Sequence, residues 1–63
     1  MTTMEFEKAV SEGKLFLMRQ YKAMGLWSAG KVVTAEVAAR KARIWVYSDK
    51  TGERYCPYHF ELA

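Results

Sequence analysis

The chain has 63 residues, a formal net charge of +3, one cysteine and one histidine. A chain of this length forms a single small domain, residues 1–63, which buries only about 60% of the surface of its unfolded state. One cysteine cannot form an internal disulfide, and one cysteine with one histidine cannot complete a tetrahedral zinc site. The chain contains neither a membrane-spanning apolar run nor a secretion signal, which predicts a cytoplasmic protein without membrane association.

The first part of the chain is predicted to be helical over residues 4–24. Phe6 and Val10 are four residues apart, and apolar residues resume after Gly13 at a helical spacing. The helix is either continuous, with a weak point at Gly13, or broken there into two. A strand over residues 14–21 is the alternative interpretation, because four consecutive apolar residues follow Lys14.

The connection over residues 26–33 is too apolar to be a solvated loop. Leu26 and Trp27 are expected to fold back onto the first helix. Gly30 belongs to a turn signal. Val32 and Val33 then predict a short strand that adds to a C-terminal hairpin.

A second helix is predicted from Ala35 to Ala42. Thr34 is a favourable N-cap, and Glu36 lies in the first turn, where the helix dipole stabilises a carboxylate. Four alanines favour the helix by propensity.

A β-hairpin follows the second helix. Residues 43–47 are rich in β-branched and aromatic side chains, and residues 53–56 form the returning strand. With Asp49 first in a type I turn and Gly52 at a positive φ, we expect a three-residue loop with a bulge. Pairing of Asp49 with Glu53 would place Tyr47 opposite Tyr55. Alternation over residues 58–62 predicts a short final strand or an extended tail.

These elements predict an α+β fold with an N-terminal helix, a second short helix and a C-terminal hairpin. An all-α alternative would continue the second helix through Trp45. The hairpin would expose Trp45, Tyr47 and Tyr55 as a contact surface for another protein. A domain this small also gains stability from a partner, and a second copy of the chain is the default one.

A cluster of basic residues suggests an alternative function. A basic helix end followed by a hairpin resembles the end of a winged helix, which would bind nucleic acid. The net charge permits such binding without demanding it. The residues involved would be Arg40, Lys41, Arg43, Lys50 and Arg54.

No residue pattern predicts an enzyme or a cofactor. Cys56 and His59 are three residues apart, so two chains together could hold zinc, but a packed thiol beside a surface histidine is the simpler interpretation. No third group orients a Cys–His pair for nucleophilic catalysis.

The size of the chain, its mixed charge, its single cysteine and its aromatic tail YCPYHFELA resemble the small accessory proteins of the early region of lambda-type tailed phages. This resemblance implies a non-enzymatic regulatory protein that acts in the host cytoplasm by binding a host or phage component.

Overall fold

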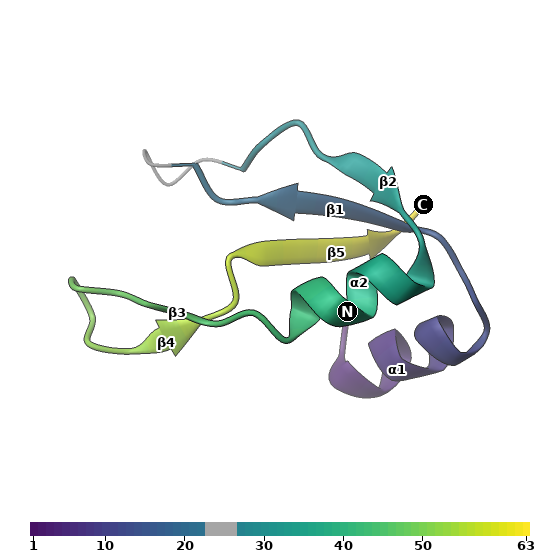
Figure 1. The fold of residues 1–63 in the computed structure, drawn as a ribbon, viewed down its shortest axis with the longest axis horizontal. Coiled ribbons are helices and arrows are strands. Elements are labelled where there is room, and N and C mark those ends of the chain that lie inside the picture. The colour runs from purple at the N-terminus through teal and green to yellow at the C-terminus, as the bar shows by residue number, and fades with distance from the viewer. Residues whose placement is uncertain (23–26) are drawn as a thin grey trace.

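The computed structural model describes residues 1–22 and 27–63 and shows an α+β fold there (Figure 1). The elements are α1 (Thr3–Ser11), β1 (Phe16–Gln20), β2 (Lys31–Val33), α2 (Ala35–Ala42), β3 (Val46–Tyr47), β4 (Arg54–Tyr55) and β5 (Tyr58–Leu62). The predicted fold class is therefore confirmed, and the all-α alternative is wrong.

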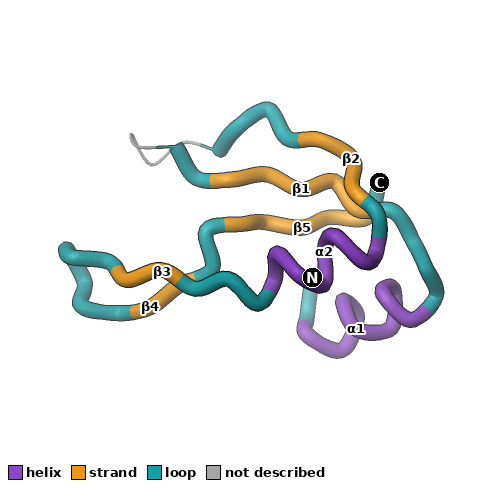
Figure 2. Tube along the Cα trace, in the orientation of Figure 1, coloured by secondary structure: helices purple, strands orange, loops and turns teal. Residues whose placement is uncertain are grey.

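The fold has two layers and a projecting hairpin. Three antiparallel strands form a sheet in the order β2-β1-β5, and α1 and α2 lie on the same side of it. The separate hairpin β3–β4 extends outward from the end of α2 (Figure 2). In the described residues, neither helix is long and apolar enough to cross a membrane.

Helix α1 has a specific signal at each end. The Thr2 hydroxyl accepts from the Glu5 N–H, while the Glu5 carboxylate accepts from the Thr2 N–H, which is a capping box. The hydrogen bonds from Thr2 lower the pKa of the Glu5 carboxyl. At the other end, Gly13 has φ +70°, and N–H groups of residues 13 and 14 bond the carbonyls of Val10 and Ala9. This Schellman motif ends the helix.

The predicted helix over residues 4–24 is therefore wrong beyond Gly13. Residues 16–20 form β1, as the alternative strand interpretation had it. The strand divides the four consecutive apolar residues between two faces, and Phe16 and Met18 lie on the buried one. The expected helix end at Met24 lies outside the described residues.

The strands flanking β1 were predicted in part. The final strand is confirmed as β5, which pairs along the length of β1. The short strand at Val32 and Val33 is confirmed as β2. It pairs with β1, where Phe16 lies opposite Val33, and not with the hairpin. The helix Ala35–Ala42 and its Thr34 cap are confirmed.

Three phenylalanine rings from different elements form the centre of the core. Phe16 of β1 is fully buried, and its ring centroid lies 5.0 Å from that of Phe6 on α1 and 6.3 Å from that of Phe60 on β5. Phe6 and Phe60 are 5.2 Å apart. Buried Ala38 lets α2 approach the same cluster closely.

The hairpin has a different register from the predicted one. Ser48, not Asp49, closes the turn: its N–H donates to the Glu53 carbonyl, and its own carbonyl accepts from Gly52. The loop thus spans residues 49–52, with Gly52 at φ +72° as expected. Tyr47 lies opposite Arg54, not Tyr55. This shift of one residue moves side chains to opposite faces of the ribbon.

Replacing the central ring tests the core assignment. Phe16→Ala should lower the free energy of unfolding by about 3–5 kcal/mol, because the substitution removes a fully buried aromatic side chain. Urea denaturation followed by circular dichroism measures the change. Met4→Ala is the control, since Met4 is exposed on α1, and it should change stability by less than about 0.5 kcal/mol. Equal effects would contradict this core.

Two glycines with positive φ should differ in their tolerance of alanine. Gly13→Ala meets no atom within 4 Å and should cost only the left-handed backbone penalty, about 1–2 kcal/mol. At Gly30 (φ +86°) a Cβ atom would lie 2.8 Å from Arg19 Cγ and 3.2 Å from the Met18 carbonyl oxygen. Gly30→Ala should therefore destabilise the domain more than Gly13→Ala in the same denaturation assay. The reverse order would contradict the close packing of β2 on β1.

Candidate binding surfaces

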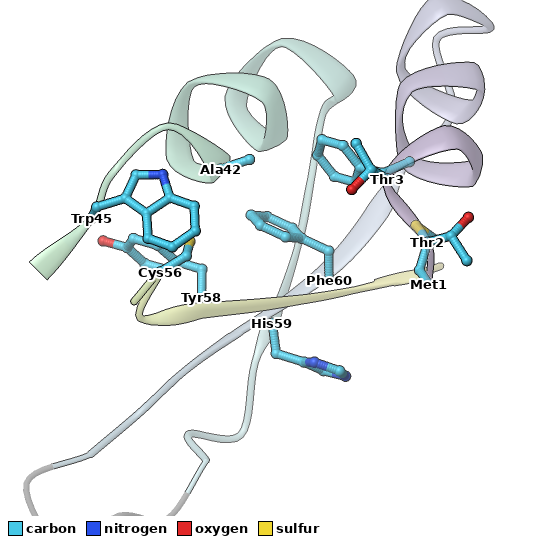
Figure 3. A pocket seen from close by; sticks show the side chains of 10 residues that line it. Met1, Thr2, Thr3, Ala42, Trp45, Cys56, Tyr58, His59 and Phe60 are labelled. Atoms are coloured by element: carbon cyan, nitrogen blue, oxygen red, sulfur yellow. The ribbon is translucent and has the colours of Figure 1, made fainter. Parts of the chain in front are cut away.

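The first candidate site is an open hollow of about 410 Å³ on the helix-bearing side of the sheet. It lies between the start of α1, the end of α2 and strand β5, and Trp45 lies beside it at the root of the hairpin (Figure 3). Most of the side chains around it are apolar. The main ones are Met1, Phe6, Ala42, Trp45, Tyr58 and Phe60.

The structure divides the predicted aromatic surface. Trp45 and Tyr47 are strongly exposed, at 53% and 64%. Tyr55 pairs with Val46 and so lies on the other face of the hairpin, where its ring packs edge-on against Tyr21 at 6.2 Å. The three residues therefore do not form one surface as predicted, because the hairpin register differs by one residue.

The predicted basic group is also spread out. The Lys41 ammonium lies 5.4 Å from the centroid of the ring of Tyr58, a residue that lines the hollow. Arg40 and Arg43 are exposed at the end of α2, whereas Lys50 and Arg54 belong to the projecting hairpin. Strands β1 and β2 separate α1 from α2, so the described residues contain no helix-turn-helix.

Cys56 and His59 lie on opposite sides of β5. The half-buried Cys56 thiol donates to the Lys41 carbonyl oxygen at 3.7 Å. The His59 ring points away from the hollow (Figure 3) and lies 3.1 Å from a carboxylate oxygen of Glu61. Within residues 1–22 and 27–63, no group of three or more metal-ligating side chains comes together.

A second candidate site, not predicted from the sequence, lies on the sheet face away from the helices. We call it the ring face: Tyr21, Trp27, Tyr55 and His59. The ring centroids of Tyr21 and Trp27 are 4.0 Å apart, and those of Trp27 and His59 are 5.1 Å apart. Tyr21 and Trp27 remain 43% and 37% exposed.

Local pairing builds the ring face. Trp27 forms an isolated antiparallel bridge with Tyr21, and the Ser28 N–H and hydroxyl bond the backbone of Gln20. Trp27 thus folds over the sheet and not onto the first helix, which corrects the prediction for Trp27. The same prediction for Leu26 lies outside the described residues. The available sequence signal was the alternation over residues 58–62, which sets His59 apart from Tyr58 and Phe60.

No protein-family model matches the chain, and neither the curated proteins nor the solved structures yield a match. We therefore infer function from the chemistry of these two surfaces.

A double-mutant cycle tests the packing of the ring face. Tyr21→Leu and Trp27→Leu should show a coupling of about 0.5–1.5 kcal/mol in the free energy of unfolding, because an aromatic pair contributes beyond its buried area. Urea denaturation of the four proteins measures it. As a control, Tyr21→Leu should be additive with Leu15→Ala, a substitution of an exposed side chain before β1. Additivity in both cycles would contradict the stacked pair.

Proposed function

We propose that this protein is a non-enzymatic accessory protein that binds another protein at the hollow beside Trp45. The observation that carries the proposal is a half-exposed tryptophan at the edge of an aromatic-lined depression. Tryptophan is enriched among the residues that dominate binding energy at protein interfaces, and such residues cluster where a partner side chain fills a pocket.

The charge around the hollow favours one kind of partner segment. Lys41 lies over the ring of Tyr58, which lines the hollow, and Arg40 and Arg43 are exposed near the end of α2. The C-terminal end of a helix also presents free carbonyl groups, which these cations offset. An amphipathic segment with acidic flanks would place an apolar side chain in the hollow and its carboxylates near these cations.

The resemblance to early-region phage accessory proteins suggests where this partner occurs. It would be a host or phage protein met in the host cytoplasm. Self-association as a homodimer would use the same side of the hairpin, since a second copy would bury the exposed Trp45 and Tyr47 rings.

Truncation of Trp45 tests the proposal. Trp45→Ala should lower partner capture at least about tenfold, because loss of a central aromatic anchor costs about 2 kcal/mol or more of binding energy. Affinity capture from bacterial cytoplasm, followed by mass spectrometry, compares the tagged wild-type chain with the variant. Leu15→Ala, which changes an exposed side chain outside the hollow, is the control and should capture the same protein as the wild type.

Two results would overturn this assignment. If Trp45→Ala captures the same protein as strongly as the wild type, the hollow is not the binding site. If circular dichroism shows that Trp45→Ala unfolds the domain, Trp45 belongs to the core. Light scattering of the wild-type chain distinguishes a homodimer from a monomer that binds another protein.

A further inference from the structure

From the ring face we infer a second binding activity, for single-stranded nucleic acid, on the side of the sheet opposite the hollow. This inference is independent of the proposed protein contact. It starts from the uncovered face of the three-stranded sheet, because both helices lie on its other side (Figure 1). Alternation along β1 places the side chains of Leu17 and Arg19 on its uncovered face. Tyr21, directly after β1, continues this alternation, and its N–H bonds the Pro57 carbonyl before β5.

The rings on this face form a continuous series across three segments. Tyr55 packs on Tyr21, Tyr21 on Trp27, and Trp27 on His59, with centroid separations of 6.2, 4.0 and 5.1 Å. Tyr21 and Trp27 are remote in the sequence from Tyr55 and His59, so the fold brings these two pairs of rings together. Tyr21, Trp27 and Tyr55 each keep more than a third of their surface exposed.

Exposed rings on an open sheet suit unpaired bases. Every base has a flat π-face, so stacking on aromatic side chains binds single strands with little dependence on sequence. In a duplex the bases already stack on one another and their faces are not accessible. The ring face therefore favours single strands over duplexes.

The charges on and beside the ring face suit phosphate. By register, Glu61 is the only carboxylate on this side of β1 and β5, and its side chain is engaged by His59. Arg19 lies opposite His59 on the same side of the sheet. Lys22 is exposed and follows the ring residue Tyr21 in the sequence, whereas Arg54 lies opposite Tyr47 on the other face of the hairpin.

Residues 1–22 and 27–63 contain only one side-chain ion pair, between His59 and Glu61. The lysines and arginines of these residues thus form no close ion pair with a carboxylate, and the whole chain carries a net charge of +3. A nucleic acid can stack its bases on the rings and also release counterions when its phosphates contact these cations. An acidic peptide segment has no bases to stack, and a second copy of this chain carries the same positive charge, so neither partner gains from both interactions.

The test uses the full chain and a fluorescein-labelled oligothymidylate of about 20 nucleotides, with fluorescence anisotropy as the readout. Binding should appear at about 50 mM salt and weaken steeply towards about 200 mM. Trp27→Leu and Tyr21→Leu should each weaken binding roughly 5-fold to 100-fold through loss of one stacked base. Trp45→Leu changes a tryptophan on the opposite side of the sheet and should bind the oligonucleotide as the wild type does.

Two further measurements keep the inference testable if a ring variant fails to fold. Lys22→Gln should reduce the slope of log affinity against log salt by about one, as expected for one lost phosphate contact. Oligouridylate of the same length distinguishes RNA from DNA as the preferred strand, and either preference supports the inference.

Several outcomes would overturn it. These are no binding at low salt, equal binding of single strand and duplex, or equal losses for Trp27→Leu and Trp45→Leu with both proteins folded. A dimer in light scattering that becomes monomeric in Trp27→Leu would assign the ring face to a second copy of the chain. Loss of oligonucleotide binding leaves the protein contact at the hollow intact, because that contact is tested by Trp45→Ala.

Discussion

The contact among Phe6, Phe16 and Phe60 is the interaction on which the rest of the structure depends. It joins α1, the central strand β1 and the last strand β5 at a single point, and Phe16 is the only large side chain of the described residues that is fully buried. A domain of this size has little other apolar area to bury. Each candidate surface is positioned by this cluster: the hollow opens beside Phe60 and Phe6, and the ring face lies on the opposite side of the strands that carry Phe16 and Phe60.

Much of the fold could be predicted because local signals determine it. The cap at Thr34, the alanines of α2, the turn glycine at Gly52 and the alternation of β5 each act within a few residues. The strand β1 was harder to predict, because a short run of apolar residues fits a buried helix and a buried strand equally well. The partners that decide the matter, β2 and β5, are remote in the sequence.

The candidate sites were less predictable for the same reason. Whether Tyr55 lies beside Tyr47 depends on one residue of register, and Ser48 closes the turn in place of Asp49. Both can bond the backbone of a turn, so composition does not choose between them. The ring face combines a local bridge between Tyr21 and Trp27 with long-range contacts. Trp27 meets His59 only because the remote strand β5 pairs with β1, and no local pattern contains that information.

The position of β1 in the middle of the sheet also governs how the chain reaches its native state. Residue 16 pairs with residue 62, so the central ladder joins two strands separated by most of the polypeptide. Closing that loop costs conformational entropy before the strand pairing contributes any stabilisation. This order slows folding relative to a helical bundle of similar length. Before β5 pairs with β1, the edge of β1 has unpaired backbone groups and its apolar face is exposed. The partly folded chain is therefore vulnerable to aggregation and to proteolysis at that stage.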